Sequence, residues 1–468
     1  MRRAELHAVG AMPRRGRRLL ETFSLSGLLT LLVAAPLAAQ TADTVLTLSG
    51  ARSILQLNSP DYRAALASAD ATGEGVWTAW GSWIPSATLQ ANFTRNEFTT
   101  RTFLDPTGVV QRLDQPITDV AKSASQALVF RWSLFEGGGR LFDVGASKAR
   151  ARAADLRAIS TLVQLNSQME FQYWEALKQQ ELARLALDLL AARRRDVEIA
   201  QARFRIAAVA QTDVLQAEVQ VGQNEVAVLQ AEQRAEAARR ELSASLGLEE
   251  DLSYRLRDTV SVFDPTQFEL SDLVALARGS NPELARLDAE IDAAGKSLWS
   301  ARATWLPRID LTLSLSRSEQ LTGDAGLFEL GPENTGNNFG FTLSWPLLNG
   351  FEKKTRTGQE SARLQEARHT KAAQLLDTDK EIRNQYDALV VVYQSVQIRT
   401  RLVELARESV RLTTERYRIG ATSYLELQRA IDQLTEAERG LIDARYNFMQ
   451  ALAQLQGAVG RPIAIPND

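Results

Sequence analysis

The residues that most often carry catalysis or bind metals are scarce in this sequence. It has no cysteine, which excludes disulfides, zinc–thiolate sites and thiol nucleophiles. Its two histidines, His7 and His369, lie far apart, and His7 falls in a segment that we expect to be removed. The glycine run after Glu136 is not a phosphate-binding loop, because no Gly-Lys-Ser/Thr follows it. We therefore predict no catalytic residue, no metal site and no cofactor, and we expect that the chain is not an enzyme.

Two carboxylates at matching positions are the residues with the clearest chemical potential. Asp213 and Glu426 each follow a predicted turn and begin the helix that returns from it. An acid in the first turn of a helix interacts favourably with the helix dipole, which explains both residues without a ligand. Alternatively, copies of these acids brought together by oligomerisation would bind cations and contact Arg205 or Arg418. The sequence leaves both interpretations open.

The chain contains an internal repeat, which is its strongest structural signal. Five short segments of the first half recur in the same order in the second half. The matched ranges are 83–89 with 305–311, 58–61 with 280–283, 132–137 with 345–350, 203–206 with 416–419, and 246–247 with 459–460. We therefore predict two structural units, roughly 43–260 and 261–468, each with a short helix, a strand pair and a long helical hairpin.

Long helices are expected where proline is absent. No proline lies between Pro116 and Pro265, or between Pro346 and Pro462. Each gap predicts a helical hairpin, and the arms of the first hairpin are expected at about 140–204 and 212–246.

Both gaps contain apolar residues at the spacing of a coiled coil. Those in the first gap are Leu215, Val219, Val226 and Leu229. Those in the second gap are Ile382, Tyr386, Leu389, Tyr393, Val396, Leu427, Ile431, Leu434, Leu441, Phe448, Leu452 and Leu455. Hairpins of this length expose too much apolar surface to remain alone, so we expect them to pack on other copies. An ordinary helical bundle domain is the alternative for the helices taken without the strands.

Four segments alternate between apolar and polar residues, as β-strands with two different faces do. They are 89–94, 128–134, 309–316 and 339–347. Each predicts a strand of about 9–11 residues with the pattern of an outer-membrane barrel. Trp132 and Trp345 lie near strand ends, where an aromatic girdle would meet outer-membrane lipid. A soluble antiparallel sheet is the alternative, and the long helices between the two strand pairs argue against it.

Four strands are too few to close a barrel around water. An open sheet would leave unpaired backbone groups at its edges, which a lipid environment penalises strongly. Several protomers must therefore contribute strands to one barrel. The connecting segments, about 95–123 and 318–337, contain Asp, Asn, Pro and Gly and are predicted to be extracellular loops.

Residues 1–40 have the features of a secretory signal peptide. A basic run at 14–18 precedes an apolar run at 25–35, and small residues at 38–42 offer cleavage sites. A retained transmembrane helix is the alternative, but the apolar run is short for one. Residues 1–40 contain six arginines and two glutamates, so their removal takes the formal charge from −3 to about −7. An acidic exported protein is not expected to bind nucleic acid.

The order of these parts resembles the TolC family of outer-membrane efflux proteins over nearly the whole mature chain. A short helix ending in Trp-x-Pro, a strand pair, a Leu-Phe-x-Gly-Gly exit and a long hairpin each occur twice. The most specific motifs are the hairpin turns, RFRIAAVAQTDVLQA at 203–217 and RYRIGATSYLEL at 416–427. The later run ARYN at 444–447 is also typical of the family.

The resemblance implies an α+β membrane protein that forms a homotrimer. Each protomer would give four strands to a twelve-stranded β-barrel, continued by a long coiled-coil helical tunnel in the periplasm. The implied function is passive conduction of small molecules from an inner-membrane pump through a periplasmic adaptor protein. Asp213 and Glu426 would then ring the periplasmic entrance.

The resemblance also implies that the hairpin tips contact the adaptor. The implied contact residues are Phe204, Arg205, Ile206, Ala207, Ala208, Tyr417, Arg418, Ile419, Gly420 and Ala421. Ala207 departs from the family pattern, which commonly has glycine there, as this chain has at Gly420.

Two other functions remain open on the sequence. The outer-membrane outlet of a type I protein-secretion system would have the same architecture as an efflux channel. A periplasmic adaptor would also contain a coiled-coil hairpin. It would, however, lack the four apolar-faced strands and would usually have one hairpin rather than two.

Overall fold

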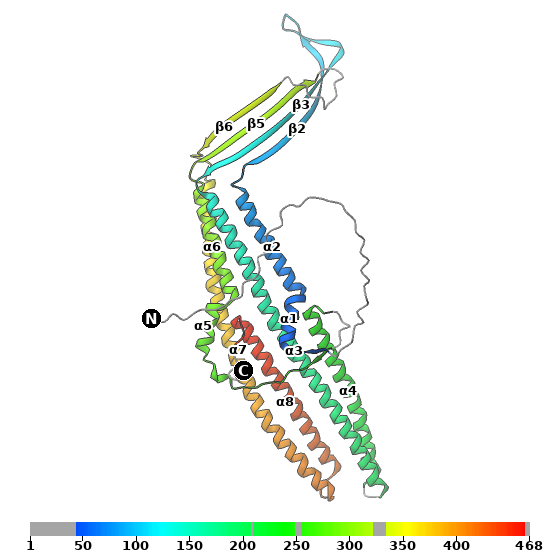
Figure 1. Cartoon of the computed structure of the whole chain (residues 1–468). Helices are drawn as coiled ribbons and strands as arrows, with labels where there is room; N and C mark the ends of the chain where they lie inside the picture. The colour runs from blue at the N-terminus through cyan, green and yellow to red at the C-terminus, as the bar shows by residue number, and fades with distance from the viewer. Residues whose placement is uncertain (1–43, 207–208, 249–253, 322–333, 464–468) are drawn as a thin grey trace, which may run out of the picture. The chain divides into compact units, whose positions relative to one another are not determined.

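A computed structural model describes residues 44–206, 209–248, 254–321 and 334–463 (Figure 1). The predicted signal peptide, Ala207 and Ala208 lie outside these residues. Among the residues described, no helix combines the length and the apolar character needed to cross a bilayer.

Each half has two helices ahead of its strands, and the second of these helices begins with a proline. These are α1 (Leu48–Asn58) and α2 (Pro60–Gly81) in the first half, and α5 (Leu270–Ser280) and α6 (Pro282–Ala303) in the second. The side chain of Ser59 accepts a hydrogen bond from the backbone of Tyr62 and caps α2. Asn281 caps α6 in the same way through the backbone of Glu283. A polar cap followed by proline starts a helix well, because proline needs no hydrogen-bond partner in the first turn.

Two long helical hairpins follow the strands, as predicted. Their helices are α3 (Gly139–Arg205), α4 (Gln211–Leu246), α7 (Glu352–Arg418) and α8 (Tyr424–Val459). The longer arms, α3 and α7, both have 67 residues, and the shorter arms, α4 and α8, both have 36. The predicted arms at 140–204 and 212–246 are therefore confirmed. In Figure 1, α4 lies along α3 and α8 lies along α7.

Four strands form one antiparallel sheet in the order β2-β3-β5-β6. They are β2 (Ser86–Leu104), β3 (Val110–Glu136), β5 (Arg308–Leu321) and β6 (Thr335–Ser344). The pairing of β3 with β5 joins the two halves of the chain. The register places Phe130, Leu313 and Phe339 in one row, so the apolar residues of neighbouring strands share a face. The predicted two-faced sheet is therefore confirmed.

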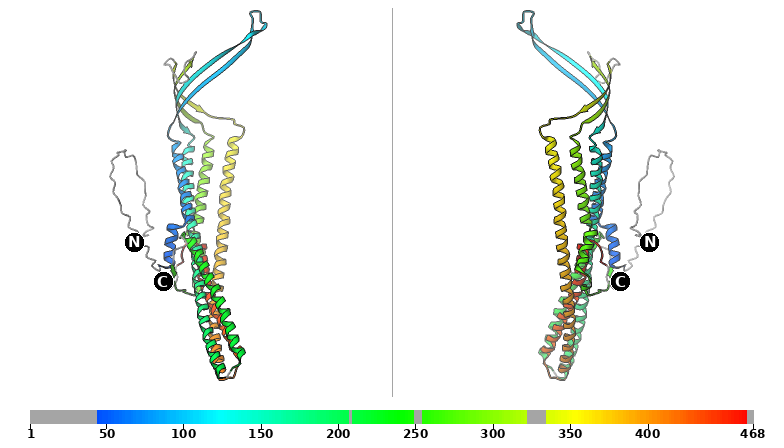
Figure 2. Two further views of the ribbon diagram at one scale, coloured as in Figure 1. Left: turned by 90° about the vertical axis from the view of Figure 1, so that its right-hand side faces the viewer. Right: turned by 90° about the vertical axis from the view of Figure 1, so that its left-hand side faces the viewer.

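β2 and β3 are longer than predicted, at 19 and 27 residues. The expected loop at 95–123 is wrong, because both strands continue through most of it to a short turn after Leu104. In both views of Figure 2 this β2–β3 ribbon extends beyond the ends of β5 and β6. The register shifts between Thr100 and Thr102, and Pro116 falls within this irregularity. A bulge needs no ladder hydrogen bond from proline, so the strand can tolerate it.

Two further strand predictions need correction. A bulge between Ser133 and Phe135 removes Leu134 from the alternation, so that Phe135, not Leu134, pairs with Ile309. β6 ends at Ser344, and Trp345 therefore lies just beyond the strand. The following residue, Pro346, ends the strand because it has no N–H to donate. Most of the expected second loop, 318–337, lies outside the residues described.

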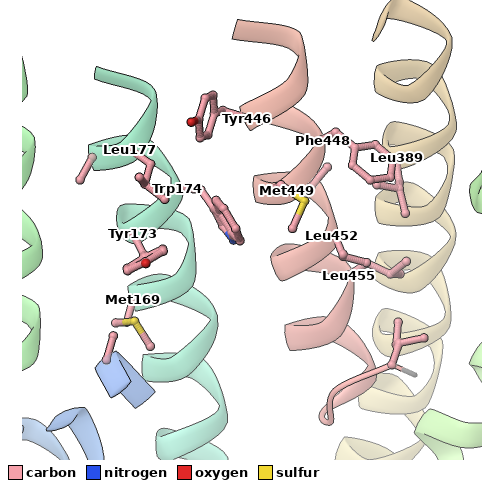
Figure 3. Close-up of a cluster of buried hydrophobic side chains, with 14 of the residues drawn as sticks. Met169, Tyr173, Trp174, Leu177, Leu389, Tyr446, Phe448, Met449, Leu452 and Leu455 are labelled. Atoms are coloured by element: carbon pink, nitrogen blue, oxygen red, sulfur yellow. The ribbon is translucent and has the colours of Figure 1, made fainter. Parts of the chain in front are cut away.

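The main hydrophobic core lies where α3, α7 and α8 pack together. Trp174 of α3 reaches toward α8, and Phe448 of α8 lies beside Leu389 of α7 (Figure 3). Phe448 and Leu389 are completely buried and Trp174 is nearly so. Each such side chain contributes roughly 1.5–3 kcal/mol when it is removed from water. This core holds the two hairpins of one chain together.

A small parallel sheet and one short helix beside this core were not predicted. They are β1 (Thr44–Leu46), β4 (Tyr254–Leu256) and the 3-10 helix η1 (Pro265–Gln267). The buried hydroxyl of Tyr173 donates to the carbonyl oxygen of Leu46 at 3.0 Å. The carboxylate of Asp258 accepts from the backbone N–H of Leu48 at 2.8 Å. These contacts fasten the start of the first half to α3.

Candidate functional site

The second hairpin turns at Gly420, as the sequence predicts. Gly420 has φ +77°, a left-handed conformation that glycine adopts without the steric penalty of a side chain. The backbone N–H of Ala421 donates to the carbonyl of Arg416 at 2.8 Å and closes the end of α7. The hydroxyl of Ser423 accepts from the backbone N–H of Glu426 at 3.3 Å and caps α8.

The first hairpin turns differently. α3 ends at Arg205 with Ile206 as its C-cap, and α4 begins at Gln211 after Ala210, which offers no side-chain cap. The backbone N–H of Asp213 donates to the carbonyl of Ala210 at 3.1 Å. The loss of glycine at Ala207 is therefore accompanied by the loss of a polar cap.

The tips expose large apolar side chains to the surroundings. Ile206 and Ile419, which occupy equivalent positions in the two repeats, are 75% and 72% exposed. Phe204 is also exposed, as are Arg205 and Arg418. An exposed isoleucine at each turn gives the tips an apolar surface.

The structure brings the two tips into contact. The guanidinium of Arg203 on α3 lies 4.7 Å from the ring of Tyr417 on α7. Tyr417 also lies 5.9 Å from Tyr424 on α8, measured between ring centroids. Tyr424 is buried against Ala200 and Ala217 of the first hairpin. A cation–π contact and a small apolar cluster therefore bind the two hairpins near their ends.

A buried arginine joins the hairpins above this cluster. The side chain of Arg193 on α3 is 2% exposed, and its Nη2 donates to Asp432 on α8 at 2.8 Å. Its Nη1 donates to the amide oxygen of Gln428 at 2.5 Å, and Asp196 lies 3.8 Å away. A buried guanidinium is strongly destabilising without such partners. This site was not predicted from the sequence, because Arg193 lies in an Arg-Arg-Arg run and has no counterpart in the second repeat.

Burial changes the acid–base behaviour of two groups in this region. Burial raises the pKa of the Asp196 carboxyl, and the nearby Arg193 opposes this shift only in part. Burial also raises the pKa of the Tyr424 hydroxyl to about 12, with a contribution from the negative charge of Asp196. Desolvation disfavours the charged form of both groups. Tyr424 is therefore neutral at physiological pH.

Of the two acids at the return helices, Glu426 has a local side-chain partner. Within the described part of a single chain, neither Asp213 nor Glu426 forms an ion pair. The carboxylate of Glu426 accepts from the hydroxyl of Thr422, and Arg418 pairs with Glu415 at 3.2 Å. The predicted contact of Glu426 with Arg418 is therefore not formed within one protomer. Both acids occupy the first turn of their helix, as the dipole interpretation requires.

The two predicted girdle tryptophans form equivalent contacts where the strands meet the helices. The indole N–H of Trp132 donates to the carbonyl of Trp83 at 3.0 Å. That of Trp345 donates to the carbonyl of Trp305 at 3.1 Å. Trp132 is 40% exposed and Trp345 58%, so each ring keeps a free face while its polar atom is satisfied.

A basic side chain completes each of these corners and was not predicted. Arg140 and Lys353, at equivalent positions, are both buried and begin the long helices. Arg140 donates to the carbonyl of Ser133, and Lys353 donates to that of Pro346 at 2.7 Å. Each cation also lies over the ring of the Trp-x-Pro tryptophan of its own repeat, at 5.6 and 5.7 Å. The sequence signal that could have revealed these corners is a basic residue at matching positions of the two repeats, shortly after the glycine turn.

Comparisons with known proteins agree with this architecture. The sequence profile of the outer membrane efflux protein family matches residues 51–248 and 273–461. The alkaline protease secretion protein AprF of Pseudomonas aeruginosa is 26% identical over 322 residues, which cover 67% of this chain and 64% of AprF. The outer membrane protein TolC of Vibrio cholerae is 22% identical over 86% of this chain and 88% of TolC.

A solved structure has the same fold. The outer membrane protein VceC of Vibrio cholerae superposes with a TM-score of 0.70 at 17% identity, over 89% of this chain and 96% of VceC. The matched family consists of channel proteins of the outer membrane that extend into the periplasm, and these are not enzymes. The chain therefore belongs to the TolC-like family of outer membrane efflux proteins.

Proposed function

We propose that the mature chain is the outer-membrane channel of a tripartite efflux system, which passively conducts small molecules from an inner-membrane pump through a periplasmic adaptor. The observation that carries this proposal is the four-stranded sheet, which has one apolar face and ends at β2 and β6. The apolar face suits lipid, and the two end strands suit pairing with further copies. Three copies would close a barrel of twelve strands.

The helices support the same assembly. The predicted seam residues Val226 and Leu229 of α4 are 53% and 67% exposed within one chain. Ile398 and Leu402 of α7 are 62% and 50% exposed. α4 and α7 are the outer helices of the pair of hairpins, since α3 and α8 lie between them. A neighbouring protomer would bury both rows and continue the tunnel.

The mass of the detergent-extracted protein tests this assembly. We expect a species of three chains by native mass spectrometry, because closure of the sheet requires complete protomers. Charged substitutions in the α4 row, such as Val226→Asp with Leu229→Asp, should reduce the trimer fraction at least tenfold. Gln223→Asp, at an exposed polar position of the same helix, is the control. A monomer that remains dispersed without detergent would contradict the proposal.

The entrance ring stays a proposal. In a trimer, Asp213 and Glu426 would supply six carboxylates near the tips, and their mutual repulsion would favour bound cations. The double variant Asp213→Asn and Glu426→Gln should raise the resting conductance and weaken block by divalent cations. Asp272→Asn is the matched control, because Asp272 occupies the first turn of α5, away from the tips. Unchanged conductance and block would leave only the dipole interpretation.

A protein-secretion outlet is the second candidate, and the similarity to AprF favours it. The two functions separate when the chain is expressed in a host that lacks its own outlet. An efflux channel would restore resistance to small toxic compounds, whereas a secretion outlet would restore release of a protein into the medium.

In both cases we propose that the exposed Ile206 and Ile419 meet the adaptor, and that Trp132 and Trp345 contribute to the barrel girdle.

A further inference from the structure

Tryptophan is concentrated where the sheet meets the helices. Of the eight tryptophans in the chain, only Trp174 lies in the helical core. The other seven lie within or next to the ends of α2, α6, β3 and β6. They are Trp77, Trp80, Trp83, Trp132, Trp299, Trp305 and Trp345.

These tryptophans form two levels that recur in both repeats. Trp83 and Trp305 adjoin the strands, together with Trp132 and Trp345. Trp77 and Trp299 form a second level, since each lies six residues earlier on its helix. Six residues of α-helix span about 9 Å. Trp77 is 73% exposed and Trp299 53% exposed, although neither belongs to a strand.

A cation lies over a tryptophan at the helix end in each repeat, over Trp80, between the two levels, in the first repeat and over Trp299 in the second. The Lys148 ammonium lies 5.2 Å from the ring of Trp80, and the Arg302 guanidinium lies 4.8 Å from the ring of Trp299. Phe142 stacks on the same Trp299 at 5.9 Å between centroids. Each site therefore combines an exposed aromatic surface with a positive charge.

Trp299 and the polar face of the sheet line different clefts. One cleft of about 430 Å³ is lined by Glu136 and Arg308 of the polar face and by Asp143 of α3. Trp299 and Arg302 line another cleft. Arg150 lies two turns beyond Asp143 on the same side of α3, and it lines a further cleft with Thr72 of α2 on this polar side. Trp77 lies five residues from Thr72, roughly 140° around α2, so both residues of the second level are turned away from the polar side.

We propose that the ends of α2 and α6 lie in the headgroup layer of the inner leaflet, and that Lys148 and Arg302 bind lipid phosphates there. The headgroup and interfacial layer on one side of a bilayer is about 5–8 Å thick, close to the separation of the two levels. Tryptophan, lysine and arginine are the side chains that anchor proteins at this depth. The inference rests on the proposed insertion of the sheet's apolar face into the membrane.

Site-directed labelling measures this contact. Because the chain has no cysteine, Trp77→Cys and Trp299→Cys each give a single site for a bimane fluorophore. The labelled trimers are placed in phosphatidylethanolamine vesicles that contain a nitroxide lipid, with the nitroxide either on the headgroup or on carbon 12 of the acyl chain. Thr72→Cys, on the polar side of the same helix, is the matched control. Leu89→Cys, on the apolar face of the sheet, reports insertion independently.

We expect headgroup nitroxide to quench the labels at 77 and 299 at least threefold more than the label at 72. Acyl nitroxide should quench the label at 89. Quenching at 89 without quenching at 77 and 299 would overturn the lipid contact and would indicate that a neighbouring protomer covers these positions. Absence of quenching at 89 would instead contradict the insertion itself. If a cysteine variant fails to insert, Trp77→Phe with Trp299→Phe should lower the headgroup quenching of intrinsic fluorescence.

The phosphate contact has its own test. Anionic headgroups should be preferred over zwitterionic ones in the shell around α2 and α6. The variant Lys148→Gln with Arg302→Gln should lower the ratio of quenching by nitroxide-labelled phosphatidylglycerol to that by nitroxide-labelled phosphatidylcholine by about fivefold per cation. Arg150→Gln is the control, because Arg150 lines the cleft on the polar side. An unchanged ratio in the double variant would contradict phosphate binding.

Discussion

Arg193 makes directional contacts between the two hairpins near their tips. It is the largest fully buried side chain of the chain's described part, and its partners Gln428 and Asp432 belong to the other hairpin. Movement of the hairpins apart must break these hydrogen bonds. The apolar cluster around Tyr424 has no comparable directional requirement, since its contacts can slide.

Loss of Arg193 should weaken the tips much more than loss of its neighbour Arg194. Arg193→Met should destabilise the packing of the tips by about 1–3 kcal/mol, because it removes charged hydrogen bonds and leaves Gln428 buried. Arg194→Met is the matched control. Arg194 pairs with Glu225 at 2.8 Å, but both side chains are at least half exposed, so about 0–1 kcal/mol is expected. Hydrogen exchange of the backbone amides at 424–432 measures the destabilisation in each variant. Equal exchange rates in the two variants would contradict the role of Arg193 in packing the tips.

The stability of the tips should depend on pH through Asp196. The pKa of Asp196 is raised in the folded chain, so its contribution to stability is present in full below the unfolded pKa near 4 and is lost as pH rises through the folded pKa. Asp196→Asn should therefore slow hydrogen exchange at the tips relative to the parent chain at pH 7. After correction for intrinsic rates, this advantage should vanish toward pH 4. An advantage that grows on acidification would show that the pairing with Arg193 dominates instead.

At the scale of elements, the glycines of turns and helices should respond oppositely to alanine. Gly420→Ala should destabilise the second hairpin by about 1 kcal/mol, because its φ of +77° is strained for a residue with a side chain. A Cβ at Gly420 meets no atom within 4 Å, so the effect is conformational only. Gly222→Ala, in the middle of α4, should stabilise by about 0.5–1 kcal/mol. Thermal unfolding followed by circular dichroism measures both, and a shift of the same sign would contradict the turn geometry.

The sequence predicts the long helices better than the strands. The helices of the first hairpin were located to within one residue of their ends, since proline-free coiled-coil patterns have few alternatives. The length of β2 and β3 was underestimated, because Pro116 is read as a strand breaker unless the bulge is known. The bulge at Leu134 was likewise not visible in the sequence, so the alternation was predicted to continue through 128–134. Arg193 could not be identified, because its burial depends on contacts 235 residues away in the sequence.

At the scale of the whole molecule, one chain has the features of an incomplete assembly. The sheet ends in two strands, β2 and β6, and the exposed apolar rows of α4 and α7 lie on the outer helices. The two repeats supply helices of equal length and matching corners. The proposed trimer, which would enclose a continuous passage, explains these features together.

Planar-bilayer conductance of the purified mature protein, with its mass determined beforehand, tests this explanation most directly. We expect a trimer that inserts into the bilayer and produces discrete, uniform conductance steps. The steps should persist in the Arg193→Met and Gly420→Ala variants, because the barrel and the passage do not depend on these residues near the tips. A water-soluble monomer that never conducts would contradict the channel and would favour a periplasmic helical protein.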